Sequence, residues 1–521
     1  MKKLFRSTNH LGTAALVVSG GVIISRVLGQ LREVIFAQLL GATQVTDQYV
    51  AAFRIPDFMN YLLAGGFLSI TFIPIFSRYL ANDDEEGGWD ALTAIIRPLV
   101  IGISALTVVG WVLAPRIINE LYPDFTSEQV INTIRLTRIV LPAQIFFVSG
   151  ALFSAVQYAK GVFWIPTLAP IIYNVSIISG GVLYAVVTGT PDPEGFIWGA
   201  LIGAAIGNFA VQWWGARRVG MRLNPALPWA HPVLREYAII ALPLMLGQSI
   251  VVLDETFMSA FGDLVGDGAQ TRLQYARRTM LVPVGAIAQA ASVAAYPTLA
   301  RLFAEGKQRA LAATVDKAVS WVVVLSILAA GLLAGLAEPI MRTQFQRGSF
   351  TNADSIASGT ALFFYAFSIP MWGILQIITR SFYARRQMWV PVAVGTVSTI
   401  VAIPIYVMFR AEYGLAGVAV ASVISIGIYT TALVYLWYSD DGNAGRVGRV
   451  IDRAGRAIPP TVVGAIAAFL VARVVMSAVG GWTGSAIALV LGGGIYVAAG
   501  LGTLLGMGVL SRTPQRAGSN A

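Results

Sequence analysis

Apolar stretches of about 20 residues recur along the whole chain and are separated by short polar loops. A helix rises 1.5 Å per residue, so a stretch of this length crosses the ~30 Å hydrocarbon core of a bilayer. The pattern therefore predicts an all-α polytopic membrane protein with about 14 transmembrane helices. We expect them at 12–40, 48–80, 92–114, 131–159, 164–188, 195–218, 236–262, 271–303, 316–341, 355–382, 389–409, 413–438, 457–479 and 483–510.

The composition supports a membrane protein and excludes several kinds of chemistry. Only 12% of the 521 residues are charged, against about 25% in soluble domains. Cysteine is absent, which excludes disulfides and thiolate sites, and two histidines argue against a His-based metal site. A GxxxxGK[ST] phosphate loop is also absent from the sequence. We therefore expect no cofactor, no metal and no NTPase activity of the chain's own.

Basic residues gather in alternate loops, which orients the chain. One side has Lys2, Lys3, Arg6, Arg217, Arg222 and Arg453, whereas the opposite loops carry acids such as Asp124, Asp192 and Asp267. Cytoplasmic loops carry the excess of Lys and Arg, so both termini are expected in the cytoplasm, which requires an even number of spans. The net charge of +10 belongs to these loops, and nucleic acid is not an expected partner. The N-terminal run continues past Arg26 without a small-residue cleavage site, so it is interpreted as the first span.

The chain contains an internal duplication. Tyr158-Ala159-Lys160 with Trp164 and Pro166 recurs at an offset of 225 as Tyr383-Ala384-Arg385 with Trp389 and Pro391, and Pro74, Arg78 and Ala81 recur at an offset of 223 as Pro297, Arg301 and Ala304. A repeat of six helices returns the chain to the same side, so the copies are parallel. We expect an N-lobe at 1–225 and a C-lobe at 226–440. A basic linker, two further helices and a short cytoplasmic tail follow at 441–521.

Charged residues inside the first predicted span are candidates for a functional site. Arg26, Arg32 and Glu33 lie between apolar runs, and a charge near the bilayer centre costs ~2.5 kcal/mol or more, so such residues usually face a wet cavity. Arg26 and Glu33 are seven residues apart and share a helix face. The alternative is that Arg32 and Glu33 neutralise each other or extend to an interface.

The seventh and eighth predicted spans add further charges. Arg277 and Arg278 lie near the start of the eighth span, on a side otherwise poor in basic residues. Guanidinium groups pair bidentately with phosphate oxygens, so an arginine cluster suits a phosphate or pyrophosphate, although an interfacial anchor is the alternative. Asp254, next to Glu255, is open to three interpretations: a partner of these arginines, a cation site, or a residue at a wet helix end.

Several sequence blocks together carry a family resemblance. They are Ser25-Arg26-Val27-Leu28-Gly29, Arg32-Glu33, Gly41-Ala42, Thr46-Asp47, Ala52-Phe53-Arg54-Ile55-Pro56, Phe72-Ile73-Pro74, Ala169-Pro170 with Asn174, Tyr275-Ala276 with Arg278, Gln346-Arg347-Gly348 and Phe382-Tyr383-Ala384-Arg385. In this order, over nearly the whole chain, they resemble the MurJ (MviN) family. Its members are the lipid II flippases of peptidoglycan synthesis, within the multidrug/oligosaccharidyl-lipid/polysaccharide exporter superfamily.

The resemblance implies two six-helix lobes around a cationic cavity, with the last two helices forming a groove for a polyprenyl tail. Arg26 and Arg32 match the family's first-helix arginines and Arg278 its eighth-helix arginine; Arg32 and Arg278 would bind the pyrophosphate. Supporting or gating roles are implied for three acids. Glu33 stands where the family usually has an acid, Asp47 matches a functionally important aspartate, and Asp254 resembles a seventh-helix acid that binds sodium in some members.

The sequence departs from the family pattern in the second and eighth helices. Residues 57–62 contain none of the arginines that commonly follow Pro56, and Gly65 replaces a typical glutamate. Arg277 stands at a position that is usually acidic. Our hypothesis is that Arg277 replaces the lost charge on the cavity wall. The span 390–409 has no acid, so the sodium site of some relatives is incomplete here.

The sequence thus predicts a non-enzymatic flippase of the bacterial inner membrane. It would move lipid II to the outer leaflet by alternating access, driven by the membrane potential or an ion gradient, with lipid II and membrane lipids as partners. One alternative is a flippase for another polyprenyl-pyrophosphate-linked oligosaccharide. The other is a non-transporting scaffold with cell-wall synthesis proteins as partners. A drug/cation antiporter is disfavoured because the intramembrane charges are mainly basic.

Overall fold

The computed structural model describes residues 11–63, 67–385, 387–439 and 447–506, and every regular element in these ranges is a helix. The all-α prediction is confirmed. Lys2, Lys3, Arg6 and Gly65 lie outside the described residues. The helices are α1 Leu11–Leu40, α2 Gln44–Ala52, α3 Arg54–Leu63, α4 Phe67–Ala81, α5 Glu85–Leu121, α6 Ser127–Val140, α7 Ala143–Ala159, α8 Trp164–Thr188, α9 Pro193–Gly203, η2 Ala204–Ala210, α10 Val211–Arg218, α11 Pro232–Asp263, α12 Ala269–Pro283, η3 Val284–Gln289, α13 Ala290–Ala304, α14 Gln308–Gly335, α15 Ala337–Phe345, α16 Asn352–Ala366, α17 Ile369–Ala384, α18 Trp389–Tyr438, α19 Val447–Val479 and α20 Gly481–Gly506.

Polar residues mark where several of these helices begin. Asp84, Thr126, Asp192 and Thr351 are the N-caps of α5, α6, α9 and α16, and each side chain accepts a hydrogen bond from a backbone N–H of the first turn. These bonds satisfy donors that a helix start leaves without an intrahelical partner. The local sequence therefore explains these helix starts.

Helical structure occurs in all of the predicted spans, but the number of membrane crossings differs from the number of helices. Within the described residues, eight helices are long and apolar enough to cross a membrane, or nine if the pair α16 and α17, bent by 46°, is one span. Gly414, with φ 54° and ψ −129°, breaks α18 between the predicted spans 389–409 and 413–438. The predicted span 48–80 is divided among α2, α3 and α4. The total of about 14 spans stays a prediction.

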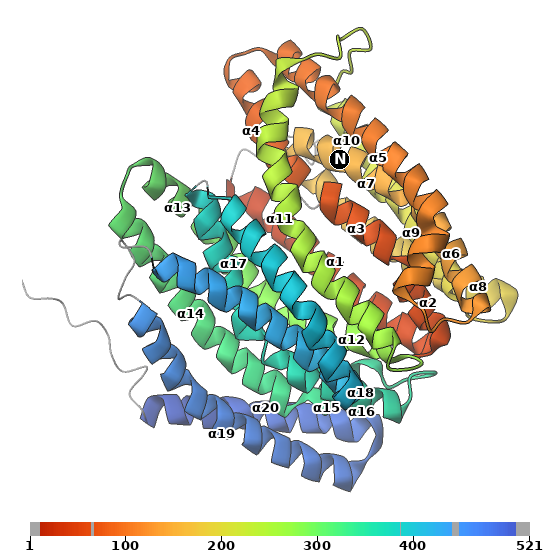
Figure 1. Ribbon diagram of the computed structural model, residues 1–521, viewed down its shortest axis with the longest axis vertical. Coiled ribbons are helices and arrows are strands. Elements are labelled where there is room, and N and C mark those ends of the chain that lie inside the picture. The colour runs from red at the N-terminus through yellow and green to blue at the C-terminus, as the bar shows by residue number, and fades with distance from the viewer. Residues whose placement is uncertain (1–10, 64–66, 386, 440–446, 507–521) are drawn as a thin grey trace, which may run out of the picture. The chain divides into compact units, whose positions relative to one another are not determined.

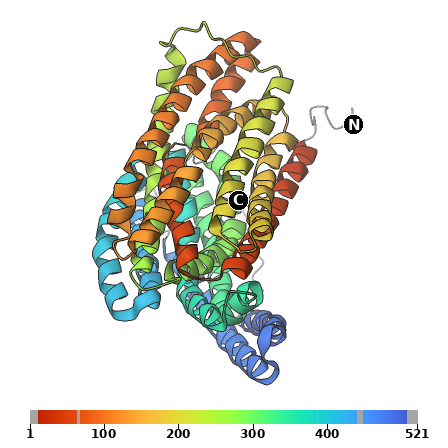
Figure 2. The ribbon, with the colours of Figure 1, turned by 90° about the vertical axis from the view of Figure 1, so that its right-hand side faces the viewer.

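The chain forms two compact units, Met1–Gly268 and Ala269–Ala521 (Figures 1 and 2). In the first unit, aromatic side chains of α4, α5 and α7, including Phe72, Phe76, Trp89 and Phe153, pack in one core. Helix α11, expected in the C-lobe, packs against α3, α4 and α5 of this unit. The predicted lobes 1–225 and 226–440 follow the sequence repeat, whereas the two compact units divide between Gly268 and Ala269. The division into lobes stays a prediction.

Three polar contacts hold α11 within the first unit. Near its start, Glu236 receives two hydrogen bonds from Arg78 of α4, at 2.9 and 2.7 Å. Farther along, Glu255 pairs with Arg54 of α3, at 3.2 Å. Near its end, the Ser259 hydroxyl is 2.8 Å from the hydroxyl of Tyr122, which follows α5. The helix is therefore attached near its start and near its end.

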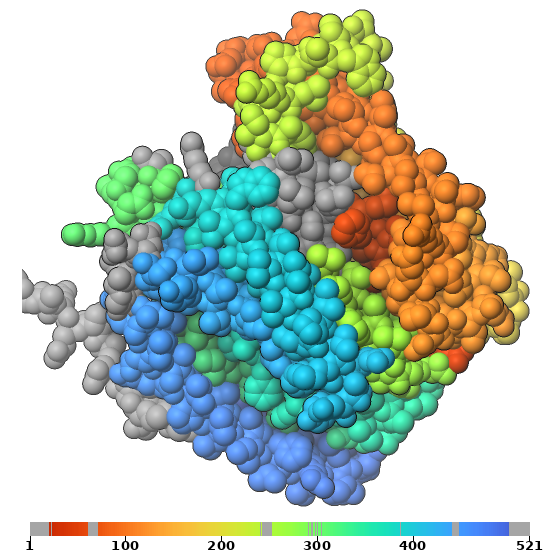
Figure 3. Space-filling model, in the orientation of Figure 1, coloured from red at the N-terminus to blue at the C-terminus, as the bar shows by residue number. Residues whose placement is uncertain are grey.

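In the second unit, α14 packs against α17 and α19, and α19 packs against α20. The space-filling view shows α19, in blue, along one edge of this unit (Figure 3). Gly335 of α14 lies so close to α19 that a Cβ atom there would be 2.7 Å from the carbonyl oxygen of Ala465. Small residues thus permit the close approach of these helices.

The duplication coincides with helix boundaries. Helices α7 and α17 end at Ala159 and Ala384, and α8 and α18 begin at Trp164 and Trp389, all at the offset of 225. Helices α4 and α13 end at Ala81 and Ala304, at the offset of 223. The repeated sequence signals therefore mark the same structural events in each copy.

Candidate functional site

Arg32 and Glu33 form an ion pair on α1. Nη2 and Nε of Arg32 donate to Oε1 of Glu33, at 2.6 and 3.1 Å. Glu33 is buried, whereas the Arg32 side chain keeps 21% of its surface exposed. Within the described part of the chain, Nη1 of Arg32 has no hydrogen-bond partner. The ion pair is the one that the alternative interpretation expected, and it leaves Nη1 of Arg32 without a bond to Glu33.

Arg26, one of the two first-helix arginines of the predicted site, lies on the exposed side of α1. Its neighbours Ile23 and Val27 are each 62% exposed, so this side is apolar apart from Arg26. Glu33 pairs with Arg32 rather than with Arg26, although the spacing placed Arg26 and Glu33 on one face. On the opposite side, the Asn174 amide of α8 donates to the carbonyl of Ser25, at 3.5 Å. Asn174 thus serves helix packing, as expected for an intramembrane amide.

Asp47 lies in the first turn of α2 and is 2% exposed. Its Oδ2 accepts a hydrogen bond from the backbone N–H of Gly268, at 2.6 Å. Nearby, Nε2 of Gln44 donates to Oδ2 of Asp267, at 2.6 Å. Two hydrogen bonds therefore attach the segment 264–268, which follows α11, to the start of α2.

Glu255 has a buried partner that the sequence interpretation missed. Its partner is Arg54 of α3, which is 4% exposed and also donates to the carbonyl of Val50, at 3.2 Å. The neighbouring Asp254 is half-buried. A signal for the pair was available, because an arginine in the second predicted span required an acidic partner, and Glu255 is a membrane-embedded acid.

Helix α12 of the second unit carries three arginines in different environments. Nε of Arg272 donates to Oδ1 of Asp354 on α16, at 2.8 Å, while Oδ2 of Asp354 accepts from the N–H and hydroxyl of Thr351. Arg277 is only 5% exposed, and Arg278 is half-buried. Arg272 is thus attached to the start of α16, and Arg277 lies deeper in the unit than Arg278.

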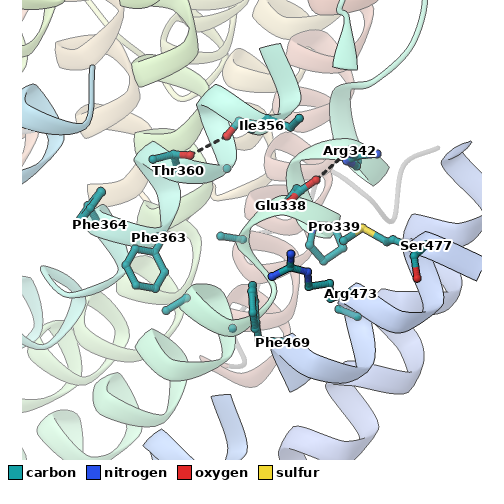
Figure 4. Close-up of a pocket in the computed structure, with 16 residues that line it drawn as sticks. Glu338, Pro339, Arg342, Ile356, Thr360, Phe363, Phe364, Phe469, Arg473 and Ser477 are labelled. Atoms are coloured by element: carbon teal, nitrogen blue, oxygen red, sulfur yellow. Dashed lines mark hydrogen bonds and ion pairs between the residues drawn. The ribbon is translucent and has the colours of Figure 1, made fainter. Parts of the chain in front are cut away.

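A groove runs along the second unit between α14, α16 and α19. It consists of two pockets of about 550 and 610 Å³ that share Ala334, Gly335, Phe363 and Phe469. The first is lined by apolar residues apart from Thr461. The second also contains the ion pair between Arg342 and Glu338, at 2.6 Å, and Arg473 of α19 points into it, as Figure 4 shows. An apolar channel with charges at one end fits an amphipathic lipid.

Within the described residues, no group of three or more His, Asp or Glu side chains is placed to hold a metal ion. The acids at the candidate positions have other roles instead. Glu33 pairs with Arg32, and Asp47 accepts a hydrogen bond from Gly268.

The family model described as lipid II flippase MurJ matches residues 36–493. The chain belongs to this family. The MurJ family consists of transporters, so the chain is a polytopic inner-membrane transporter and not an enzyme. The family resemblance of the sequence blocks is thereby confirmed.

Relatives in the MurJ family match most of the chain at modest identity. The probable lipid II flippase MurJ of Vibrio cholerae is 26% identical over 439 residues, covering 82% of this chain and 83% of the relative. The lipid II flippase MurJ of Burkholderia cenocepacia is 27% identical over 395 residues, covering 74% of this chain and 76% of the relative.

Solved structures agree on the fold. A lipid II flippase MurJ in an inward closed conformation aligns with a TM-score of 0.76 at 22% identity, covering 95% of this chain and 100% of that one. An inward-facing multidrug resistance MATE transporter of the MOP superfamily aligns with a TM-score of 0.65 at 15% identity, covering 82% and 95%. The MurJ fold and that of the wider superfamily therefore extend over the chain.

Proposed function

We propose that this MurJ family member moves lipid II from the cytoplasmic to the outer leaflet by alternating access. The family match over residues 36–493 carries the proposal. The pyrophosphate of the cargo would be bound by Arg32 and Arg278, with Arg26 and Arg277 adding positive charge. Guanidinium groups suit this role because they bind phosphate oxygens bidentately while staying charged. No bond of the cargo is made or broken.

The acids would support or gate the arginines. Glu33 orients Arg32 through its two hydrogen bonds. Asp47 holds the segment 264–268 that leads into α12, the helix of Arg277 and Arg278. Asp254 directly precedes Glu255, whose ion pair with Arg54 joins α11 to α3. A movement of α11 would therefore also move Asp254. We assign these acids no direct contact with the cargo.

Both termini would lie in the cytoplasm, in accord with the basic loops. The membrane potential would then favour outward movement of an anionic cargo, by ~2.3 kcal/mol per charge per 100 mV. It also favours inward return of an empty, cationic site. The driving force would thus be the membrane potential or an ion gradient.

The groove between α14, α16 and α19 would hold the polyprenyl tail while the head group crosses. We expect Ala334→Trp to slow transport about 10-fold, because its indole would displace roughly two buried methylene groups, at ~0.8 kcal/mol each. Ala334 lines both pockets of the groove. The rate of lipid II translocation in liposomes measures the effect.

The matched control is Val463→Trp, which puts the same side chain on the exposed side of α19, outside the groove. This control should transport like the wild type. Equal rates for the two variants would contradict a tail site in the groove.

Arg277→Ala is expected to impair function about as much as Arg278→Ala, if Arg277 supplies the charge missing from the second helix. Growth rescue of a bacterium depleted of its own lipid II flippase measures both, with membrane levels checked by immunoblot. Arg301→Ala is the control, because Arg301 lies exposed near the end of α13. Full rescue by Arg277→Ala would contradict the hypothesis that Arg277 replaces the charge missing from the second helix.

The same rescue tests the proposed function. Wild-type protein should restore growth to the depleted bacterium. A well-expressed wild-type chain that fails to do so would contradict lipid II as the cargo. Another polyprenyl-linked oligosaccharide, suggested by the altered second helix, or a scaffold role would then be favoured.

A further inference from the structure

Asp263, the last residue of α11, is a buried carboxyl group without a hydrogen-bond partner. It is 8% exposed, and its Oδ2 makes no hydrogen bond in the described part of the chain. It lies one residue beyond the predicted span 236–262, where the segment 264–268 begins. Burial of an unpaired carboxylate is costly, so such a group normally acquires a partner or becomes neutral.

The charged groups that act on Asp263 are all acids of the first unit. They are Asp47 on α2, Asp124 between α5 and α6, and Asp267 in the segment after α11. Burial and these like charges raise the pKa of Asp263 to about 7. The arginines of the helices packed against α11 are engaged elsewhere. Arg54 pairs with Glu255, Arg78 with Glu236 and Arg116 with Glu120, and Arg97 donates to the backbone carbonyls of Asn224 and Leu227.

Two of these acids are the ones that attach the segment 264–268 to α2. Asp47 accepts from the Gly268 N–H, and Asp267 accepts from Gln44. A negative charge on Asp263 repels both acceptors, whereas a neutral Asp263 does not. The attachment is therefore compatible with a neutral carboxyl group and is weakened by an ionised one.

We propose that Asp263 is a proton-binding site that keeps the segment 264–268 attached to α2 when it is protonated and loosens the segment when it ionises. The ligand is a proton rather than a metal ion, since no metal-binding group of acids occurs among the described residues. The segment ends at Gly268, directly before α12 in the sequence. This inference does not depend on the identity of the cargo.

Hydrogen exchange of the purified full-length protein in detergent tests the proposal. The reporter is the peptide covering residues 264–268, at about pH 5.5 and about pH 8.5, with rates corrected for intrinsic exchange. In the wild type, the protection of this peptide against exchange should fall ~10-fold from the lower to the higher pH. This is the change expected if the pKa of Asp263 differs by about one unit between the attached and the loosened segment. Asp263→Asn, which mimics the protonated acid, should stay protected at both pH values. Asp124→Asn removes one repelling charge and so lowers the pKa of Asp263, and the loosening of the segment should move to lower pH.

Three results would overturn the proposal. The first is wild-type protection that does not depend on pH, and the second is the same pH dependence in Asp263→Asn. The third is protection that changes when sodium replaces choline as the buffer cation but does not change with pH. Glu120→Gln is the matched control, because Glu120 is an exposed acid at the same end of α5, paired with Arg116. It should behave like the wild type.

Thermal unfolding gives a second, independent readout. An aspartate titrates near 3.9 when unfolded, and the folded pKa of Asp263 is about 7. Because the ionised form is disfavoured in the folded state, the wild type loses stability as pH rises from about 4 to about 7. The unfolding temperature of Asp263→Asn should therefore exceed that of the wild type by a gap that grows over this window and then stays constant. A gap that shrinks as pH rises would contradict the proposal.

Discussion

Arg32→Ala is expected to abolish growth rescue of a flippase-depleted bacterium while leaving the membrane level of the protein near normal. The substitution removes a guanidinium group whose Nε and Nη2 are held by Glu33 and whose Nη1 makes no bond to Glu33. One charge-assisted hydrogen bond to a pyrophosphate oxygen is worth ~1.5–3 kcal/mol, so transport should fall ~10- to 100-fold. Arg32→Lys keeps the charge but loses the fork, and should rescue only partly.

A double variant separates cargo binding from simple ion pairing. If Arg32 served only to neutralise Glu33, removing both charges would restore function, because no lone buried charge would remain. We expect Arg32→Ala/Glu33→Gln to stay inactive. Recovery of rescue in the double variant would reassign Arg32 to a structural role.

Glu255→Ala is expected to produce the largest loss of stability, ~3 kcal/mol or more. Arg54 is 4% exposed, so removal of Glu255 leaves a buried guanidinium without its nearest carboxylate, since Asp57 is 3.7 Å away. Breaking a buried ion pair by removing one partner typically costs ~3–5 kcal/mol. The pair joins α3 to α11, so the loss should appear as a lower unfolding temperature of the protein in detergent.

The control for Glu255→Ala is Glu120→Ala, which breaks an ion pair with Arg116 whose side chains are 80% and 67% exposed. Exposed pairs contribute about 1 kcal/mol or less. If both variants lowered the unfolding temperature equally, the Arg54–Glu255 pair would not be the attachment of α11 that its burial indicates.

The apolar pattern was sufficient to predict the helices, and the repeated motifs were sufficient to predict the duplication. The span 164–188 coincides with α8, and the repeated Tyr-Ala and Trp signals lie at helix ends and starts. These features depend on local sequence, because helix length and chain-reversing residues are set within a few turns. The breaks at Gly414 and between α2, α3 and α4 were only partly predicted, since apolar composition does not reveal where a helix changes direction.

The partners of charged residues were harder to predict, because they depend on contacts distant in sequence. Arg32 and Glu33 are adjacent, and their pairing was foreseen as an alternative. Arg54 and Glu255 are about 200 residues apart, and only packing of α11 within the first unit brings them together. Asp263 lies one residue beyond the predicted span 236–262, and its burial follows from the same packing.

Direct translocation of lipid II tests the central claim. Purified protein would be placed in liposomes containing lipid II with a fluorophore on its head group, and a membrane-impermeant reductant would be added outside. The account predicts that wild-type protein makes the inner-leaflet fluorophore accessible, faster under a potential that drives anions outward, and that Arg32→Ala does so ~10- to 100-fold more slowly. The account would be contradicted if the inner-leaflet fluorophore were equally protected from the reductant in liposomes with wild-type protein and in protein-free liposomes.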